Sequence, residues 1–173
     1  MQRLTVTLLP PYTFIPGQAP HPVSDPAGHS FGRTAEPVAH FDSADWQTCH
    51  PYLYGIDLFN HGFYWEAHEA WESLWHAAGR TGPIAAFLKG LIKLAAAGVK
   101  LREGVPDGAK GHAKRAAALF RECESLGDRV MGLRPADLIG WADAAAKVMP
   151  LNSRDPLIVF SFHIVPADSP CQT

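Results

Sequence analysis

Prolines confine the regular helices of this chain to its middle. Eight of the fifteen prolines fall in residues 1–51. Each proline removes a backbone donor and clashes with the preceding helical turn, so this stretch cannot form a regular helix. It nevertheless carries the aromatic residues Tyr12, Phe14, Phe31, Phe41 and Trp46, whereas disordered tails are poor in aromatic residues. We therefore interpret residues 1–51 as an extended arm that wraps over the rest of the protein.

Helical signals dominate the sequence after this arm. Apolar residues recur at helical spacing, Gly62 is suited to end the first helix, and Asp107 is expected to cap the fourth. The third expected helix is apolar almost all round except for its lysines, which predicts that it is central and buried. Short linkers imply antiparallel neighbours. The sequence thus predicts an all-α, compact bundle of about five helices in antiparallel hairpins, over residues 52–60, 63–77, 83–103, 108–126 and 135–148.

A chain of 173 residues is expected to form one structural domain. We divide it into the arm (1–51), a helical domain (52–149) and an extended C-terminal tail (150–173). Residues 157–165 are β-prone and residues 4–9 alternate as a strand does, so the two ends are candidates for a short β pairing.

Composition excludes several classes of function. The formal net charge is -2 and no polybasic run is present, so no nucleic-acid partner is expected. The apolar run at the N-terminus is broken by Pro10 and Pro11, so neither a membrane span nor a signal peptide is expected. Three distant cysteines do not suggest a disulfide framework. These features predict a cytoplasmic protein.

The segment from Trp65 to Glu72, WEAHEAWE, holds the densest chemistry in the chain. On a helix Glu66 borders the apolar stripe expected for Phe63, Ala67, Ala70 and Leu74. A carboxylate there is costly unless it is paired, so we expect a lysine, an arginine, a helix N-terminus or a metal ion as its partner. Glu66, His68 and Glu69 are the candidate catalytic residues, for acid–base or metal-assisted chemistry.

Residues from elsewhere could complete this site. Lys89 and Lys93 on the next helix are positioned to meet the carboxylates, and His21 or His29 would reach them if the arm folds over the second helix. The candidate ligand-binding residues are therefore Lys89, Lys93, Trp65, His29 and His21. The alternative is that the glutamates and His68 form a structural polar network.

The sequence lacks the usual metal motifs. His68-Glu69-x-x-Glu72 has glutamate where zinc proteases have a second histidine. No Glu-x-x-His occurs in the chain, so the di-iron carboxylate pattern is absent. The identity of any metal is unknown, and a divalent metal ion is an alternative rather than the favoured cofactor.

Residues 28–32, GHSFG, match the nucleophile motif of α/β hydrolases. That motif requires a preceding strand, a following helix and a parallel sheet. Here prolines flank it and the rest of the chain is helical, so the match does not predict an α/β hydrolase.

The run LFNHGFYWEAHEAWESLWH, followed by FLKGLIKLAAAGVKLREG, resembles the prokaryotic family named domain of unknown function 309. The resemblance covers roughly residues 52–126. It implies a small all-α fold of helical hairpins, distantly similar to tetratricopeptide pairs, and no agreed activity. Glu66, His68 and Glu69 occupy the family's Glu-Ala-His-Glu positions. Members often have glutamine where this chain has Lys89 and Lys93, and two ammonium groups would compete with a cation for the carboxylates.

Two functions follow as hypotheses. The first is a small-molecule or metal-binding site on the Glu-Ala-His-Glu helix beneath the arm. The second is a non-catalytic module of helical hairpins that binds a protein partner. Whether the protein is an enzyme stays open, as does homodimerisation, which the aromatic content permits and no residue establishes.

Overall fold

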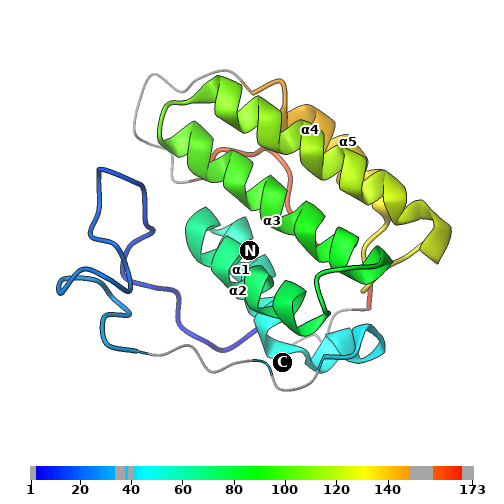
Figure 1. Ribbon diagram of the computed structural model, residues 1–173, viewed down its shortest axis with the longest axis horizontal. Coiled ribbons are helices and arrows are strands. Elements are labelled where there is room, and N and C mark those ends of the chain that lie inside the picture. The colour runs from blue at the N-terminus through cyan, green and yellow to red at the C-terminus, as the bar shows by residue number, and fades with distance from the viewer. Residues whose placement is uncertain (1–2, 34–37, 39–40, 149–157, 169–173) are drawn as a thin grey trace.

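The protein is an all-α bundle, as predicted from the sequence (Figure 1). The structure, a computed structural model, describes residues 3–33, 38, 41–148 and 158–168. Over these residues the chain forms five α-helices and two short 3-10 helices. In order they are η1 (Ser43–Thr48), α1 (His50–Asn60), α2 (Tyr64–Ala77), α3 (Pro83–Arg102), α4 (Pro106–Glu122), η2 (Glu124–Leu126) and α5 (Pro135–Ala145).

Helix α3 is the central helix of the bundle, because it packs against both α2 and α4. Two glycines let its neighbours approach closely. A Cβ atom on Gly90 would lie 2.4 Å from the ring of Phe120 in α4, and one on Gly98 would lie 2.5 Å from the ring of Tyr64 in α2. The prediction of a buried third helix is confirmed, and its small residues set the spacing of the layers.

The helix boundaries follow the glycines and prolines closely. Gly62 has φ of 85° after α1, the left-handed conformation predicted for it. The expectation of Asp107 as a cap is wrong: α4 begins at Pro106, the residue before it is Val105 without a side-chain cap, and Asp107 lies in the first turn. There the positive end of the helix dipole still stabilises its carboxylate.

Side chains of α1 bind residues of both segments that were candidates for a β pairing. Within the described residues no β strand forms, and Leu157 lies outside them. The backbone amides of Leu4 and Thr5 donate to the carboxylate of Asp57 at 2.7 and 2.8 Å. Asn60 hydrogen-bonds residue Ile164 of the C-terminal segment. Asp57 and Asn60 are both buried. In the described residues, contacts with these two side chains of α1 take the place of the candidate β pairing.

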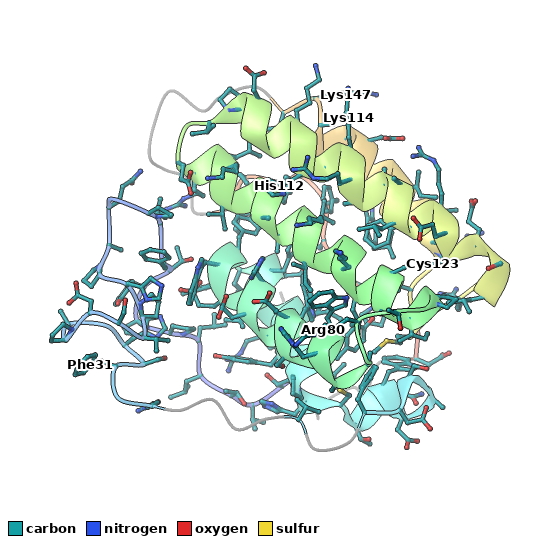
Figure 2. The ribbon with its side chains drawn as sticks, viewed as in Figure 1. Phe31, Arg80, His112, Lys114, Cys123 and Lys147 are labelled. Carbon is teal, nitrogen blue, oxygen red and sulfur yellow. The ribbon has the colours of Figure 1, made fainter. Side chains whose placement is uncertain are left out.

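The N-terminal arm begins beside α1, where Leu4 and Thr5 bind Asp57, and then loops out beside the bundle (blue in Figure 1). Its aromatic residues reach α2: the ring of Phe14 lies 5.3 Å from the ring of Trp65, edge to face. Farther along, Phe31 is 51% exposed at the outer edge of the arm (Figure 2). No helix in the described part of the chain is long and apolar enough to cross a membrane.

Candidate functional site

Helix α2 presents one set of residues to the core, Glu66 to the arm, and His68, Glu69 and Glu72 together as a separate cluster. Its buried apolar residues are Tyr64, Ala67, Trp71 and Leu74. The predicted stripe was right at Phe63, Ala67 and Leu74, but Trp71 is fully buried where Ala70 was expected. Glu66 of the same helix contacts the arm.

Glu66 is buried, at 7% exposure, and the arm supplies its partners. Its Oε2 atom accepts a hydrogen bond from Thr13 Oγ1 at 2.7 Å, and its Oε1 atom accepts one from the backbone amide of Phe14 at 2.8 Å. His29 Nε2 lies 3.4 Å from Oε1. Within the described residues, the hydrogen-bond partners of Glu66 are thus groups of the arm and include no lysine or arginine. These donors offset the desolvation cost of the carboxylate.

His29 is the residue that links the arm to the buried carboxylate. Its side chain is 9% exposed, and its Nδ1 atom lies 3.0 Å from Ser30 Oγ. The ring packs edge to face against Tyr12, with centroids 4.8 Å apart. The Tyr12 hydroxyl accepts the backbone amide of His29 at 3.2 Å and donates to the Pro20 carbonyl at 3.0 Å. One ring contact with Tyr12 and polar contacts at both ring nitrogens thus hold the imidazole.

A cavity of about 960 Å³ lies between the arm, α1 and α2. Its apolar lining consists of Leu8, Leu9, Pro10, Pro11, Pro22, Val23, Leu58, Trp65 and Ala70. Its polar lining consists of Thr7, His29, Ser30, Arg33, Tyr54, Glu66 and Glu69. The Tyr54 hydroxyl donates to the Leu8 carbonyl at 2.8 Å, which ties the arm to α1. Burial, followed by the nearby charge of Glu66, raises the pKa of Tyr54.

The predicted ligand-binding residues His21 and Trp65 lie together at the side of this cavity. Their rings are 5.3 Å apart, and both contact Phe14. Trp65 lines the cavity and His21 does not. The Nδ1 atom of His21 accepts the backbone amides of Val23 and Ser24, both at 3.3 Å. His21 therefore supports the arm and the Trp65 wall.

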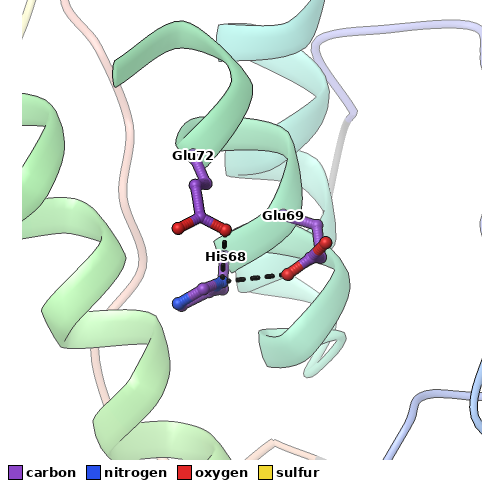
Figure 3. Close-up of side chains that lie close together, drawn as sticks. All are labelled: His68, Glu69 and Glu72. Carbon is purple, nitrogen blue, oxygen red and sulfur yellow. Dashed lines mark ion pairs between the residues drawn. The ribbon is translucent and has the colours of Figure 1, made fainter. Parts of the chain in front are cut away.

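A second cluster on α2 consists of His68, Glu69 and Glu72 (Figure 3). His68 Nδ1 lies 3.3 Å from Glu69 Oε1 and 4.0 Å from Glu72 Oε2. One ligand atom from each residue falls within 4.8 Å of the others, which is a spacing that a metal ion can bridge. Both glutamate side chains are well exposed, at 46% and 40%. The three residues can hold a cation, and Glu69 also reaches the cavity.

The predicted lysines do not pair with these glutamates. Within the described part of the chain, neither Lys89 nor Lys93 forms an ion pair with Glu66, Glu69 or Glu72. The Nζ atom of Lys89 lies over the ring of Trp75, 5.1 Å from its centroid. Burial, then the charges of Arg115 and Lys89, lowers the pKa of Lys93, and Glu72 partly opposes this.

His112 is a partly buried histidine of α4 (Figure 2). Burial, and then the charges of Arg115, Lys93 and Lys100 with a contribution from His68, lowers the pKa of His112 to about 4. Cationic side chains thus surround His112, and His68 contributes to the same effect.

The predicted site residues thus occupy two places. Glu66, His29 and Trp65 meet at the cavity, whereas His68 and Glu72 do not line it. Glu69 belongs to both places. The sequence reasoning missed Ser30 and Thr13 as partners. The GHSFG motif contains Ser30. The sequence around it lacks the strand, helix and parallel sheet that the hydrolase motif requires, so the motif did not predict a role for Ser30.

Comparison with known proteins gives a match to a family model over part of the chain. Residues 52–112 match the family model described as Domain of unknown function (DUF309), which confirms the resemblance. No curated protein and no solved structure matches the chain significantly. The matched segment runs from α1 into α4 and contains α2, whereas the arm that forms the other wall of the cavity lies outside it.

Proposed function

We propose that this protein, whose residues 52–112 match the family model of domain of unknown function 309, binds a small molecule. The binding site is the cavity under its N-terminal arm. The observation that carries the proposal is the buried Glu66–His29 pair at the wall of a cavity of about 960 Å³. The pair provides polar anchoring, and the apolar lining provides most of the contact area.

The size and lining of the cavity support this function. Sites for small molecules commonly span about 300–1,000 Å³ and combine apolar walls with a few convergent polar groups. Here the walls are mainly leucine, proline and tryptophan, while carboxylate, imidazole, hydroxyl and guanidinium groups share the same space. The fitting ligand has an apolar body and a polar end that can hydrogen-bond.

The composition of the two walls adds to the argument. One wall is the rigid helix α2, which contributes Trp65, Glu66 and Glu69, and the other is the irregular arm, which contributes His29 and Ser30. Binding residues are often carried by loops that a rigid scaffold positions. The burial of Glu66 by arm residues also argues against the alternative of a protein-interaction groove on this face, because the arm already covers it.

A screen of fragments by ligand-observed NMR tests the proposal. The library should contain neutral esters and amides, amines and carboxylates. We expect saturable binding to the wild-type protein and its loss in Ala70→Leu, which fills the cavity from α2. Ala118→Leu adds the same side chain at an exposed position of α4 and is the matched control. Absence of saturable binding, or equal binding to Ala70→Leu, would refute the proposal.

A metal ion at His68, Glu69 and Glu72 is the second candidate function, supported by the 4.8 Å spacing of their ligand atoms. Inductively coupled plasma mass spectrometry of tag-free protein tests it. Bound metal should disappear in His68→Ala and Glu72→Gln, and persist in His76→Ala, a histidine of the same helix that accepts a hydrogen bond from Arg80. Metal-free wild-type protein after incubation with divalent cations would exclude this candidate.

A further inference from the structure

We propose that Ser30 is a nucleophile for acyl transfer, activated by His29 and supported by Glu66, and that the ligand class of the cavity is a carboxylic ester. This inference rests on the proposed function, because it places the substrate in the same cavity. It adds a reaction and a substrate class that cavity shape alone does not give.

The geometry of the three side chains is the first argument. Ser30 Oγ lies 3.0 Å from His29 Nδ1, and His29 Nε2 lies 3.4 Å from Glu66 Oε1. Serine, histidine and a carboxylate are thus connected in sequence, and all three line the cavity. Nucleophile, base and orienting group within hydrogen-bond reach are the signature of an activated hydroxyl.

The directions of these hydrogen bonds follow from the donors available. A carboxylate only accepts hydrogen bonds, so His29 Nε2 must carry the proton that faces Glu66. In the neutral imidazole Nδ1 is then the acceptor, and Ser30 must donate its hydroxyl proton to it. This is the arrangement in which the imidazole can remove that proton. The two ring nitrogens exchange the roles they have in chymotrypsin-type triads, and the proton path is equivalent.

Glu66 is held in place for this role. Thr13 Oγ1 and the amide of Phe14 each donate to one of its oxygens, at 2.7 and 2.8 Å, and its side chain is 6% exposed. Glu66 therefore acts as a positioning residue that fixes the tautomer of His29 and stabilises the imidazolium formed during the reaction.

The glycines of the GHSFG motif serve a turn of the arm rather than a strand-to-helix elbow. A Cβ atom on Gly28 would lie 2.3 Å from the carbonyl oxygens of His21 and Pro22. Gly32 has φ of +72°, a conformation that favours glycine. Ser30 itself is anchored by its amide, which donates to the Pro22 carbonyl at 2.9 Å. The turn presents Ser30 to the cavity without the fold of an α/β hydrolase.

The reaction balances with water as the only co-substrate. Ser30 Oγ attacks the ester carbonyl carbon and its proton passes to His29 Nδ1. The tetrahedral intermediate breaks its bond to the alkoxy oxygen, which leaves as an alcohol with the proton from Nδ1. Water then attacks the acyl-serine, gives a proton to His29, and releases the carboxylic acid as Ser30 Oγ recovers that proton. Arg33 lines the same cavity, and a guanidinium can stabilise the negative charge on the carbonyl oxygen.

Labelling with a fluorophosphonate probe, read by intact mass and peptide mapping, tests the proposal. We expect one covalent adduct, on Ser30, and none in Ser30→Ala. The labelling rate should fall by at least about 100-fold in His29→Gln. Ser24→Ala, a serine of the same arm that does not line the cavity, is the control and should label as the wild type does.

Hydrolysis of a p-nitrophenyl ester gives a second readout that a structural role for Glu66 would not move. Glu66→Gln should lower kcat about tenfold or more while KM changes little, and Ser30→Ala should abolish turnover. If Ser30 takes no label while fragments still bind the cavity, the nucleophile is refuted and the proposed binding function stands. If fragments also fail to bind, both are refuted.

Discussion

The side chain of Asn60 forms a two-way hydrogen-bonded pair with the backbone of Ile164. Its Nδ2 atom donates to the Ile164 carbonyl oxygen at 2.7 Å, and its Oδ1 atom accepts the Ile164 amide at 2.8 Å. Both residues are buried, Ile164 completely. The asparagine of the LFN run therefore has a structural role: it lets α1 bind the C-terminal segment much as a neighbouring strand would.

Removal of this pair should destabilise the protein. In Asn60→Ala the amide and the carbonyl of Ile164 lose their partner inside the protein, at about 1–3 kcal/mol for each group left unpaired. The free energy of unfolding in urea measures the loss. Gln47→Ala, at an exposed position of η1, is the control and should change it by less than about 0.5 kcal/mol. Equal effects of the two substitutions would show that Asn60 does not hold the C-terminal segment.

A methyl group on Gly98 should disturb the packing of α3 on α2. The added Cβ would lie 2.5 Å from the Tyr64 ring, and Tyr64 is itself fixed because its hydroxyl accepts the Val159 amide at 2.9 Å. We expect Gly98→Ala to cost about 1–3 kcal/mol of unfolding free energy through overpacking.

Gly140→Ala provides the matched control for this substitution. Gly140 is a helical glycine of α5 with nothing within 4 Å of its added Cβ, so the change should stabilise the protein by about 0.5–1 kcal/mol. Thermal unfolding of the two variants should shift in opposite directions. A shift of both in the same direction would contradict the close α2–α3 contact.

His112 should make the protein less stable as the pH falls from 6.5 towards 4. Its pKa in the folded protein is about 4, below the ordinary value of 6.5, because of burial and the cations around it. Between these values the unfolded chain binds more protons at this residue than the folded chain, so the unfolding free energy falls with falling pH.

The measurement is a series of urea titrations across this pH range. His112→Gln should flatten the dependence, by an amount on the order of 1 kcal/mol once screening by solvent is allowed for. His163→Gln, which removes an exposed histidine, should leave it unchanged. A dependence that survives in His112→Gln would place its origin elsewhere.

The helices could be predicted because their signals are local. Prolines, glycines and apolar periodicity lie within a few residues of the boundaries they set, and the predicted start of α3 and α5 at Pro83 and Pro135 is confirmed. The exact burial face of α2 was harder, because Trp71 and Ala70 are both apolar and only tertiary packing decides between them.

The candidate site could be predicted only in part, because its second wall comes from an irregular segment. Thr13 lies 53 residues from Glu66 in the chain and His29 lies 37 from it. A proline-rich arm has no periodicity from which its path can be read. The sequence offered His21 and His29 as two arm histidines that would reach the second helix if the arm folds over it. The contact of His29 with Ser30 and the separation of His68 from Glu66 depend on the path of the arm and the packing of α2.

Several expectations from the sequence stay predictions. They are the division into residues 1–51, 52–149 and 150–173, the cytoplasmic location, and homodimerisation. The roles of the named site residues also stay predictions until ligands or substrates are found.

Titration of the protein with its best-binding fragment, followed by the tryptophan indole signals in ¹H–¹⁵N spectra, tests the central claim most directly. Trp65 lines the cavity, whereas Trp71 is fully buried with its indole nitrogen donating to the Tyr52 carbonyl at 3.3 Å. A ligand under the arm should shift the Trp65 signal saturably and leave the Trp71 signal in place. Saturable binding that leaves Trp65 unmoved, or no saturable binding across the library, would contradict a binding site between the arm and α2.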